Sequence, residues 1–274
     1  MQGLEVFSMK MPELGKERNI RVWVPSTYET SGDKRYPVIY MHDAQNLFES
    51  ETSSYGDIWD VHTAIEGLMA AHGFDGAIVV GIDHGGSIVR LDEYSPWESD
   101  RYNELKAALD LDRNVGGEGV AYGTFLVNTL KPYIDEQYRT LPDREHTAVA
   151  GSSMGGVISL YLGVTYPEIY SKVGAFSTAG WFNSKELMNC LKSFDPKWQT
   201  RWYLDVGTNE TSNPEKEDFD IIYIESTKSI VDMLRKVGVS ETFIKVVIEE
   251  GGIHNEVDWA RRLPAALTWL FEIT

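Results

Sequence analysis

Apolar residues occur along the chain in short runs that alternate with longer segments of helical spacing. The runs are nearly continuous, as expected of strands covered on both faces. They predict strands over 20–24, 37–41, 77–82, 147–150, 173–176, 202–206 and 243–248. Helical spacing predicts helices over 61–71, 121–138, 156–165, 221–236 and 256–271, with Pro132 kinking or dividing the second. This alternation predicts an α/β fold, a mainly parallel central sheet with helices on both faces.

Two stretches break the alternation. Residues 90–119 are polar and irregular, and they are too long for a plain connection, which predicts a functional insertion near the site. Residues 182–199 form a second insertion that could act as a lid. The strands ahead of the first helix are expected to form an antiparallel hairpin at one sheet edge. Without repeats or a Pro-, Gly- or Ser-rich linker, the sequence predicts a single domain over 1–274.

Composition narrows the class of partner. A net charge of −17 over 274 residues disfavours nucleic acid and anionic membranes. No apolar stretch reaches membrane-spanning length, and the first residues do not resemble a signal peptide, so a cytoplasmic location is expected. The single cysteine, Cys190, excludes an intramolecular disulfide, and Leu187, Met188 and Leu191 beside it predict a small apolar residue in a helix. Exposed hydrophobic loops would permit a homodimer, although no interface can be identified.

The motif with the most specific chemistry is Gly151-Ser152-Ser153-Met154-Gly155. It follows a strand pattern and precedes a helical one, which is the context of a nucleophile on a sharp strand-to-helix turn. A helix N-terminus at Ser153 would favour the negative charge of an attacking alkoxide. Outside that context, the same residues would be an ordinary glycine-rich turn. The motif therefore predicts Ser153 as the nucleophile of ester or amide hydrolysis.

A serine nucleophile needs a base and an acid, which in this architecture follow it in the order acid, then base. Five histidines precede Ser153, namely His42, His62, His72, His84 and His146, so His254 is the predicted base. Spacing alone does not choose the acid. Glu210 lies in the loop at the carboxyl end of the strand over 202–206, and it is preferred to Asp205. Asp205 lies inside that strand, where an unpaired carboxylate would be costly.

An oxyanion hole needs two N–H donors. Met154, directly after the nucleophile, supplies one, and the loop after the strand over 37–41 supplies the other, at Gln45 or else Ala44. In that loop His42 and Asp43 are expected to hold the backbone. A metal site made of His42, Asp43 and His84 is disfavoured, because no pair has a recognised ligand spacing. No cofactor is expected.

With these residues located, the chain resembles the Putative esterase family of α/β-hydrolases, which includes esterase D, feruloyl esterases, enterochelin esterases and mycolyltransferases. The segments that carry the resemblance are 36–48, 80–83, Arg90, 93–97, 151–156, 204–210 and 251–254. The resemblance implies a serine hydrolase without metal or cofactor, with Ser153, Glu210 and His254 as its triad and Gln45 as an oxyanion donor. Ala44 departs from the glycine often found there, which leaves the loop conformation open.

By analogy with relatives, the expected substrates are feruloyl (cinnamoyl) or acetyl esters of carbohydrates, hydrolysed through an acyl-enzyme. Aromatic side chains suit both sugars and phenolic acyl groups, and Phe48, Trp59, Trp97 and Trp181 are the candidates for the pocket wall or for ordinary core packing. The alternatives left open are acyl transfer to a sugar or lipid hydroxyl, hydrolysis of a siderophore or another small ester, a non-catalytic binding protein, and, more weakly, a peptidase.

Overall fold

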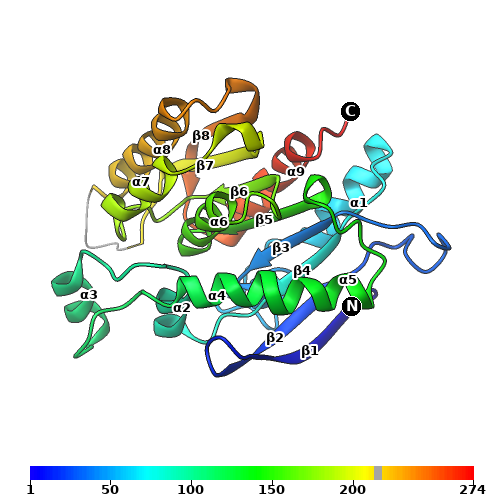
Figure 1. Ribbon diagram of the computed structural model, residues 1–274, viewed down its shortest axis with the longest axis horizontal. Helices are drawn as coiled ribbons and strands as arrows, with labels where there is room; N and C mark the ends of the chain where they lie inside the picture. Colours follow the sequence, from blue (N-terminus) through cyan, green and yellow to red (C-terminus); the bar gives the residue numbers. More distant parts are fainter. Residues whose placement is uncertain (213–217) are drawn as a thin grey trace.

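A mixed sheet runs through the residues that this computed structural model describes, which are 1–212 and 218–274, without the side chains of 102 and 106–108. Its eight strands have the order β1-β2-β4-β3-β5-β6-β7-β8 (Figure 1). Strands β3 to β8 pair in parallel, and β2 joins β4 antiparallel. The strands are β1 (Leu4–Met11), β2 (Lys16–Trp23), β3 (Val38–His42), β4 (Ile78–Ile82), β5 (Thr147–Ser152), β6 (Lys172–Phe176), β7 (Arg201–Asn209) and β8 (Ile244–Ile253).

Helices cover both faces of this sheet. One face packs against α1 (Val61–His72) and α9 (Glu256–Leu270), and the other against α4 (Gly119–Phe125), α5 (Lys131–Gln137), α6 (Met154–Thr165), α7 (Ser184–Lys192) and α8 (Phe219–Lys236) (Figure 1). Alternation along β3 divides the core accordingly, because Val38 and Tyr40 face one helical layer while Ile39 and Met41 face the other. The predicted α/β-hydrolase fold is confirmed.

The predicted helix over 121–138 is continuous but irregular. Its α-helical parts α4 and α5 flank a π-helical segment, Leu126–Leu130, and Pro132 is the second residue of α5. Proline cannot donate an N–H to the preceding turn, so the hydrogen-bond pattern changes just before it, and the helix changes type there without being divided. None of the helices in the described part of the chain combines the length and apolar character needed to cross a bilayer.

The two insertions contain more regular structure than their sequences indicate. The first includes the end of α2 (Ser87–Glu93) and all of α3 (Tyr102–Leu109). The second includes α7, in which Leu187 and Leu191 are buried in the core, so this segment is a packed layer and the lid interpretation is wrong. Cys190 lies in α7 as predicted, and burial raises the pKa of its thiol to about 12. The 3₁₀ segments are Ala44–Asn46, Arg144–His146, Pro196–Trp198 and Glu241–Phe243.

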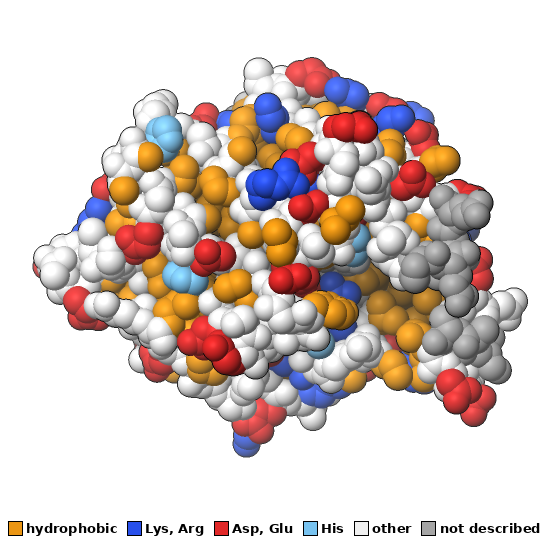
Figure 2. All heavy atoms as spheres, turned by 180° about the vertical axis from the view of Figure 1, so that it is seen from behind, with side chains coloured by type: hydrophobic (Ala, Val, Ile, Leu, Met, Phe, Trp, Pro, Cys, Tyr) orange, Lys and Arg blue, Asp and Glu red, His pale blue; other side chains and the backbone are white. Residues whose placement is uncertain are grey.

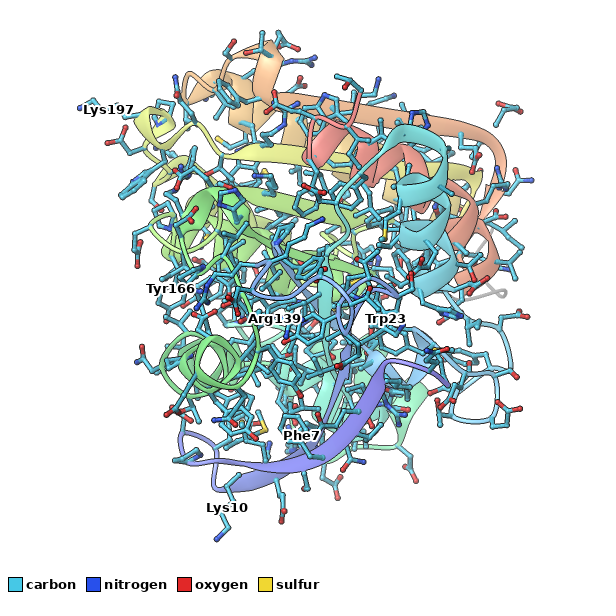
Figure 3. The ribbon with its side chains drawn as sticks, turned by 90° about the vertical axis from the view of Figure 1, so that its right-hand side faces the viewer. Phe7, Lys10, Trp23, Arg139, Tyr166 and Lys197 are labelled. Atoms are coloured by element: carbon cyan, nitrogen blue, oxygen red, sulfur yellow. The ribbon has the colours of Figure 1, made fainter. Side chains whose placement is uncertain are left out.

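Strand β1 forms the antiparallel edge hairpin with β2. The hairpin predicted from the strands over 20–24 and 37–41 is wrong in its partners. The sequence prediction does not include β1, which pairs with β2, and β3 pairs in parallel with β4 and β5 in the interior of the sheet. On β1 the side chains alternate, so Lys10 points to solvent while Phe7 packs 5.4 Å, between ring centroids, from Tyr133 (Figure 3). A strand with one solvated face has no continuous apolar run, which is why the prediction missed it.

Candidate active site

Ser153 occupies the sharp turn between β5 and α6. Its backbone has φ 57° and ψ −118°, a strained conformation for a residue other than glycine. The surrounding backbone holds it there, because its N–H donates to the carbonyl of Phe176 (2.9 Å) and its own carbonyl accepts from the N–H of Ala179 (3.1 Å). The Ser153 side chain caps no helical N–H and is partly exposed, so its hydroxyl remains available for chemistry.

Two glycines of the motif are required by close packing around this turn. A Cβ atom on Gly151 would lie 2.9 Å from the ring of His42, and one on Gly156 would lie 2.5 Å from the hydroxyl of Thr178. Contacts below 3 Å force a neighbouring group to move. The G-x-S-x-G-G pattern is therefore explained by packing as well as by the turn itself.

His254 and Glu210 meet at the carboxyl ends of β7 and β8. The Glu210 carboxylate Oε2 lies 2.6 Å from Nδ1 of His254. Glu210 is 1% exposed, whereas His254 is partly exposed, which leaves the Nε2 side of the ring toward the surface. Burial alone would raise the pKa of Glu210, but its hydrogen bonds to His254, Ser177 and Gly207 lower it, so the carboxyl is ionised at neutral pH.

The second oxygen of Glu210 is held by a buried network that the sequence analysis did not find. Oε1 accepts hydrogen bonds from the hydroxyl of Ser177 (2.5 Å) and from the N–H of Gly207 (2.8 Å). The Ser177 oxygen in turn accepts from the indole Nε1 of Trp259 (2.8 Å) and from Arg262 (3.2 Å). The network fixes the carboxylate so that only Oε2 is directed to the imidazole.

Asp205, the alternative acid, lies inside β7 and contacts Arg262 instead of the histidine. Its Oδ2 is 3.0 Å from Nε of Arg262, and its Oδ1 accepts from the N–H of Ser177 (3.2 Å). Complete burial raises the pKa of Asp205 to about 7, against the opposing attraction of Arg262. The geometry therefore pairs His254 with Glu210 and gives Asp205 a structural ion pair.

Tyr223 of α8 connects the predicted nucleophile with the predicted base. Its ring centroid lies 4.9 Å from that of His254, and the Ser153 hydroxyl is close enough to lower the pKa of the Tyr223 phenol. Ser153, Glu210 and His254 follow β5, β7 and β8, whose carboxyl ends share one edge of the parallel sheet. The structure thus brings Glu210 and His254 into direct contact and places Ser153 at the same edge of the sheet. The signal for Tyr223 in the sequence is only that of a core residue on an amphipathic helix.

The predicted oxyanion donors lie in the first turns of two helical segments. Met154 begins α6 and Gln45 lies in the 3₁₀ turn Ala44–Asn46, positions where the N–H groups have no carbonyl one turn earlier. The neighbouring Asn46 donates to the carboxylate of Glu256 (2.9 Å), two residues after His254. This hydrogen bond ties the predicted oxyanion loop to the segment that carries the base.

The strain in the oxyanion loop is at Asp43, not at Ala44. Asp43 has φ 57°, and its carboxylate receives two hydrogen bonds of 2.7 Å from the guanidinium of Arg90. Although burial opposes ionisation, Arg90 lowers the pKa of Asp43. A third hydrogen bond runs from Arg90 to the carbonyl of Ser152 (3.4 Å), so one side chain supports both the loop and the nucleophile turn. Alanine at position 44 is therefore compatible with the loop.

Gly81 gives a direct test of this loop. A Cβ atom there would lie 2.6 Å from Cβ of Ala44, so Gly81→Ala is expected to displace the oxyanion loop. We expect unfolding free energy to fall by about 1–3 kcal/mol and ester kcat to fall about ten- to hundredfold. The matched control is Gly67→Ala in α1, where nothing lies within 4 Å, and which should stabilise by about 0.5–1 kcal/mol. Urea unfolding and ester turnover of both variants are the measurements; similar behaviour of the two would contradict the assignment.

The other predicted loop residues have structural contacts. His42 Nδ1 lies 2.8 Å from the hydroxyl of Tyr122, and burial lowers the pKa of His42 to about 3, so the ring is neutral. The N–H of His84 donates to the side chain of Gln45 (3.2 Å). Among the described residues, no group of three or more His, Cys, Asp or Glu side chains is placed to hold a metal ion.

Of the four predicted pocket aromatics, Trp181 is the one whose ring contacts the site. Its ring lies 6.4 Å from Tyr223 and 5.4 Å from Phe219, measured between centroids, and it is partly exposed. Phe48 and Trp59 are each 2% exposed and packed in the core, which is the core-packing alternative of the prediction. Trp97 is partly buried edge-on against Tyr161 (6.1 Å). Seen from behind, the surface is hollowed on the side that carries α7 and α8, with hydrophobic side chains in the hollow (Figure 2).

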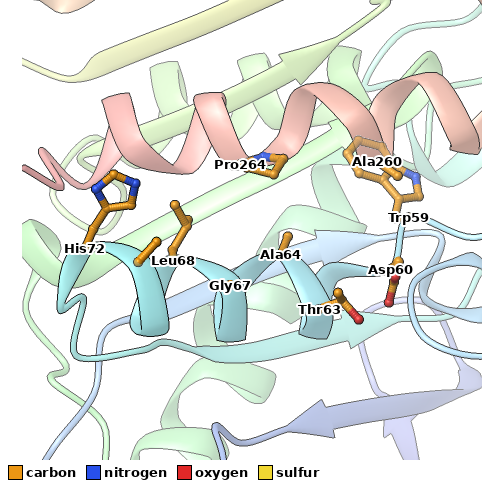
Figure 4. Close-up of a pocket in the computed structure, with 10 residues that line it drawn as sticks. Trp59, Asp60, Thr63, Ala64, Gly67, Leu68, His72, Ala260 and Pro264 are labelled. Carbon is orange, nitrogen blue, oxygen red and sulfur yellow. The ribbon is translucent and has the colours of Figure 1, made fainter.

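A separate groove of about 400 Å³ lies between α1 and α9 (Figure 4). Trp59, Leu68, Ala260 and Pro264 are among its lining residues. None of the predicted catalytic residues lines this groove, so it is distinct from the site at the carboxyl ends of the strands.

The chain is similar to several known proteins. Uncharacterized protein YbbA of Bacillus subtilis (strain 168) is 24% identical over 258 residues, which are 93% of this chain and 92% of that protein. A solved ferulic acid esterase is similar with a TM-score of 0.72 at 19% identity, covering 98% of this chain and 97% of its own. The enterobactin esterase of Shigella flexneri, solved in the presence of enterobactin, has a TM-score of 0.73 at 16% identity, over 98% of this chain and 58% of its own.

These structures establish the shared fold, and the family assignment has a separate basis. The family model described as Putative esterase matches residues 11–270, which is nearly the whole chain. The segments that carry the sequence resemblance, including the turn at Ser153 and the loop at His254, all lie within this match. The chain therefore belongs to the Putative esterase family and is a carboxylic ester hydrolase.

Proposed function

We propose that Ser153, His254 and Glu210 are the nucleophile, general base and orienting acid of a serine esterase that works through an acyl-enzyme. The observation that carries the proposal is the 2.6 Å contact between Glu210 and Nδ1 of His254, beside a serine held in a strained turn. With Nδ1 occupied by the carboxylate, Nε2 is the nitrogen that can take a proton from Ser153. Rotation of the Ser153 side chain toward the ring completes the pair, and such hydrogen bonds often tighten only when substrate binds.

The reaction follows in two balanced steps. His254 takes the Ser153 proton as Oγ bonds to the ester carbonyl carbon, and it returns that proton to the alcohol oxygen as the carbon–oxygen ester bond breaks. Water then attacks the acyl-enzyme in the same way, which releases the acid and restores Ser153. In both steps, the N–H groups of Met154 and Gln45 would stabilise the negative charge on the carbonyl oxygen. The ionised Glu210 stabilises the imidazolium between the two proton transfers.

The acyl group that we propose is aromatic, of the feruloyl type, carried on a carbohydrate or another small alcohol. In support, Trp181, Phe219 and Tyr223 form an aromatic cluster beside His254. Flat rings bury efficiently against such side chains. Two structural neighbours are named as esterases of ferulic acid and of enterobactin. The acetyl group remains the competing choice and is the natural comparison in an assay.

Ethyl ferulate and ethyl acetate share an alcohol and differ only in the acyl group. Burial of the phenolic ring in the site should raise kcat/KM for ethyl ferulate about ten- to hundredfold above that for ethyl acetate. Steady-state hydrolysis by the purified full chain, followed by chromatography of the released acids, measures this ratio. A higher value for the acetate ester would reject the aromatic acyl class while leaving the serine mechanism intact.

The same assay addresses acyl transfer. An added sugar or long-chain alcohol would be acylated by a transferase, whereas a hydrolase releases only free acid in water. We expect free acid as the main product with ethyl ferulate. An ester of the added alcohol as the main product would replace hydrolysis by transfer.

A further inference from the structure

One buried hydroxyl at the site has no role in the mechanism above. Tyr223, near the start of α8, is 0% exposed, and its ring lies 4.9 Å from that of His254 at an angle of 45°. Its hydroxyl lies 2.5 Å from the hydroxyl of Ser212, just beyond β7, and the nearby Ser153 hydroxyl lowers its pKa. Burial raises the pKa of Tyr223, so the phenol keeps its proton at neutral pH.

The sheet order fixes the side from which this hydroxyl approaches Ser153. The oxyanion loop follows β3, on one side of β5. Tyr223, Glu210 and His254 follow β7 and β8, on the other side. The Tyr223 hydroxyl therefore lies on the same side of Ser153 as the proposed base, which is where the departing alcohol receives its proton. The N–H donors for the carbonyl oxygen lie on the opposite side.

A phenol can accept one hydrogen bond and donate another. Ser212 can donate to the Tyr223 oxygen, which leaves the phenolic proton for a second acceptor. We infer that Ser153 Oγ, whose hydroxyl influences the pKa of this phenol, is that acceptor at rest. The Ser153 side chain can rotate about Cα–Cβ between staggered positions, and rotation toward His254 frees the phenolic proton for the substrate.

We propose that Tyr223 is a further catalytic residue, which orients Ser153 at rest and donates a hydrogen bond to the alcohol oxygen of the ester as its bond to carbon breaks. This proposal rests on the proposed function of Ser153 and His254. No proton leaves Tyr223; the proton that the alcohol gains still comes from His254. The hydrogen bond matters most when the alcohol is a poor leaving group, because negative charge then accumulates on its oxygen.

Tyr223→Phe tests this role, because it removes the hydroxyl and keeps the ring that packs on His254. We expect kcat/KM for an ethyl ester to fall about ten- to hundredfold. For the p-nitrophenyl ester of the same acid we expect a change below about threefold, because nitrophenolate needs little stabilisation. Ser212→Ala should give the same pattern with a smaller effect. An equal loss with both esters, or no loss with either, would overturn the proposal.

Two controls separate this proposal from others. Tyr170→Phe removes a hydroxyl that is equally buried and has no hydrogen-bond partner in the described part of the chain, and it should leave both rates unchanged. Labelling of Ser153 by a fluorophosphonate should persist in the Tyr223→Phe variant, which would show that this variant is folded. If Tyr223→Phe does not fold, the comparison of the two esters is made with Ser212→Ala instead. If the triad assignment itself fails, Ser153→Ala will retain activity with both esters, whatever Tyr223→Phe does.

Discussion

Ser153→Ala is expected to lower kcat for ester hydrolysis by about 10⁴-fold or more, because it removes the hydroxyl on which the proposed acyl-enzyme forms. Stability should change little. The Ser153 side chain caps no helical N–H, and alanine meets the same backbone strain at φ 57° that serine does. The measurements are kcat with p-nitrophenyl acetate and thermal unfolding followed by circular dichroism.

The adjacent serine provides the matched control for that experiment. Ser152 is the last residue of β5 and is buried, with 4% of its surface exposed. Ser152→Ala should therefore keep most of the activity, although both variants change one hydroxyl of the same motif. Activity that survives in Ser153→Ala but is lost in Ser152→Ala would move the nucleophile by one residue and would contradict the geometry of the turn.

Glu210→Gln should lower kcat by about 10³- to 10⁴-fold. The glutamine amide has the same shape, but it carries no charge to stabilise the imidazolium. If its oxygen keeps the hydrogen bonds from Ser177 and Gly207, its NH₂ group faces Nδ1 of His254 and favours the tautomer that cannot accept the Ser153 proton. Steady-state kinetics of the purified variant give the value.

Asp205→Asn is the companion variant, and it should lower the stability of the protein while leaving most of its activity. Asp205 contacts Arg262 rather than His254, so kcat per folded molecule should stay within about tenfold of the parent. Its unfolding free energy should fall by about 1–3 kcal/mol, because Arg262 loses one of its buried carboxylates but keeps Glu249 (2.8 Å). If Asp205→Asn were inactive and Glu210→Gln active, Asp205 would be the acid.

The interior of the fold is predictable from sequence for a simple reason. Strands such as β3 and β5 are covered on both faces, so their residues form continuous apolar runs. Helix α2 gives no such signal. Its Arg90 pairs with Asp43, and its fully buried Glu93 pairs with Lys16 (3.2 Å), so ion pairs replace apolar periodicity.

Residues of the candidate site can be predicted only where a motif, or the presence of a single residue of the required type, restricts the choice of residue. Ser153 has its motif, and His254 is the one histidine after it. The choice between Glu210 and Asp205 depends on where β7 ends, and the strand continues to Asn209, which puts Glu210 at its mouth. Tyr223 and Arg262 reach the site through tertiary packing of α8 and α9, and neither their spacing nor their neighbours distinguish them from ordinary helix residues.

The base stands directly after β8, an edge strand that pairs with β7 and is the last strand in the chain. During synthesis, the nucleophile, the oxyanion loop and the acid all leave the ribosome before this strand does. A growing polypeptide that stops short of position 254 can assemble the earlier strands and still lacks the group that activates Ser153. With His254 as the proposed base, ester turnover therefore requires that β8 has been made and has paired with β7.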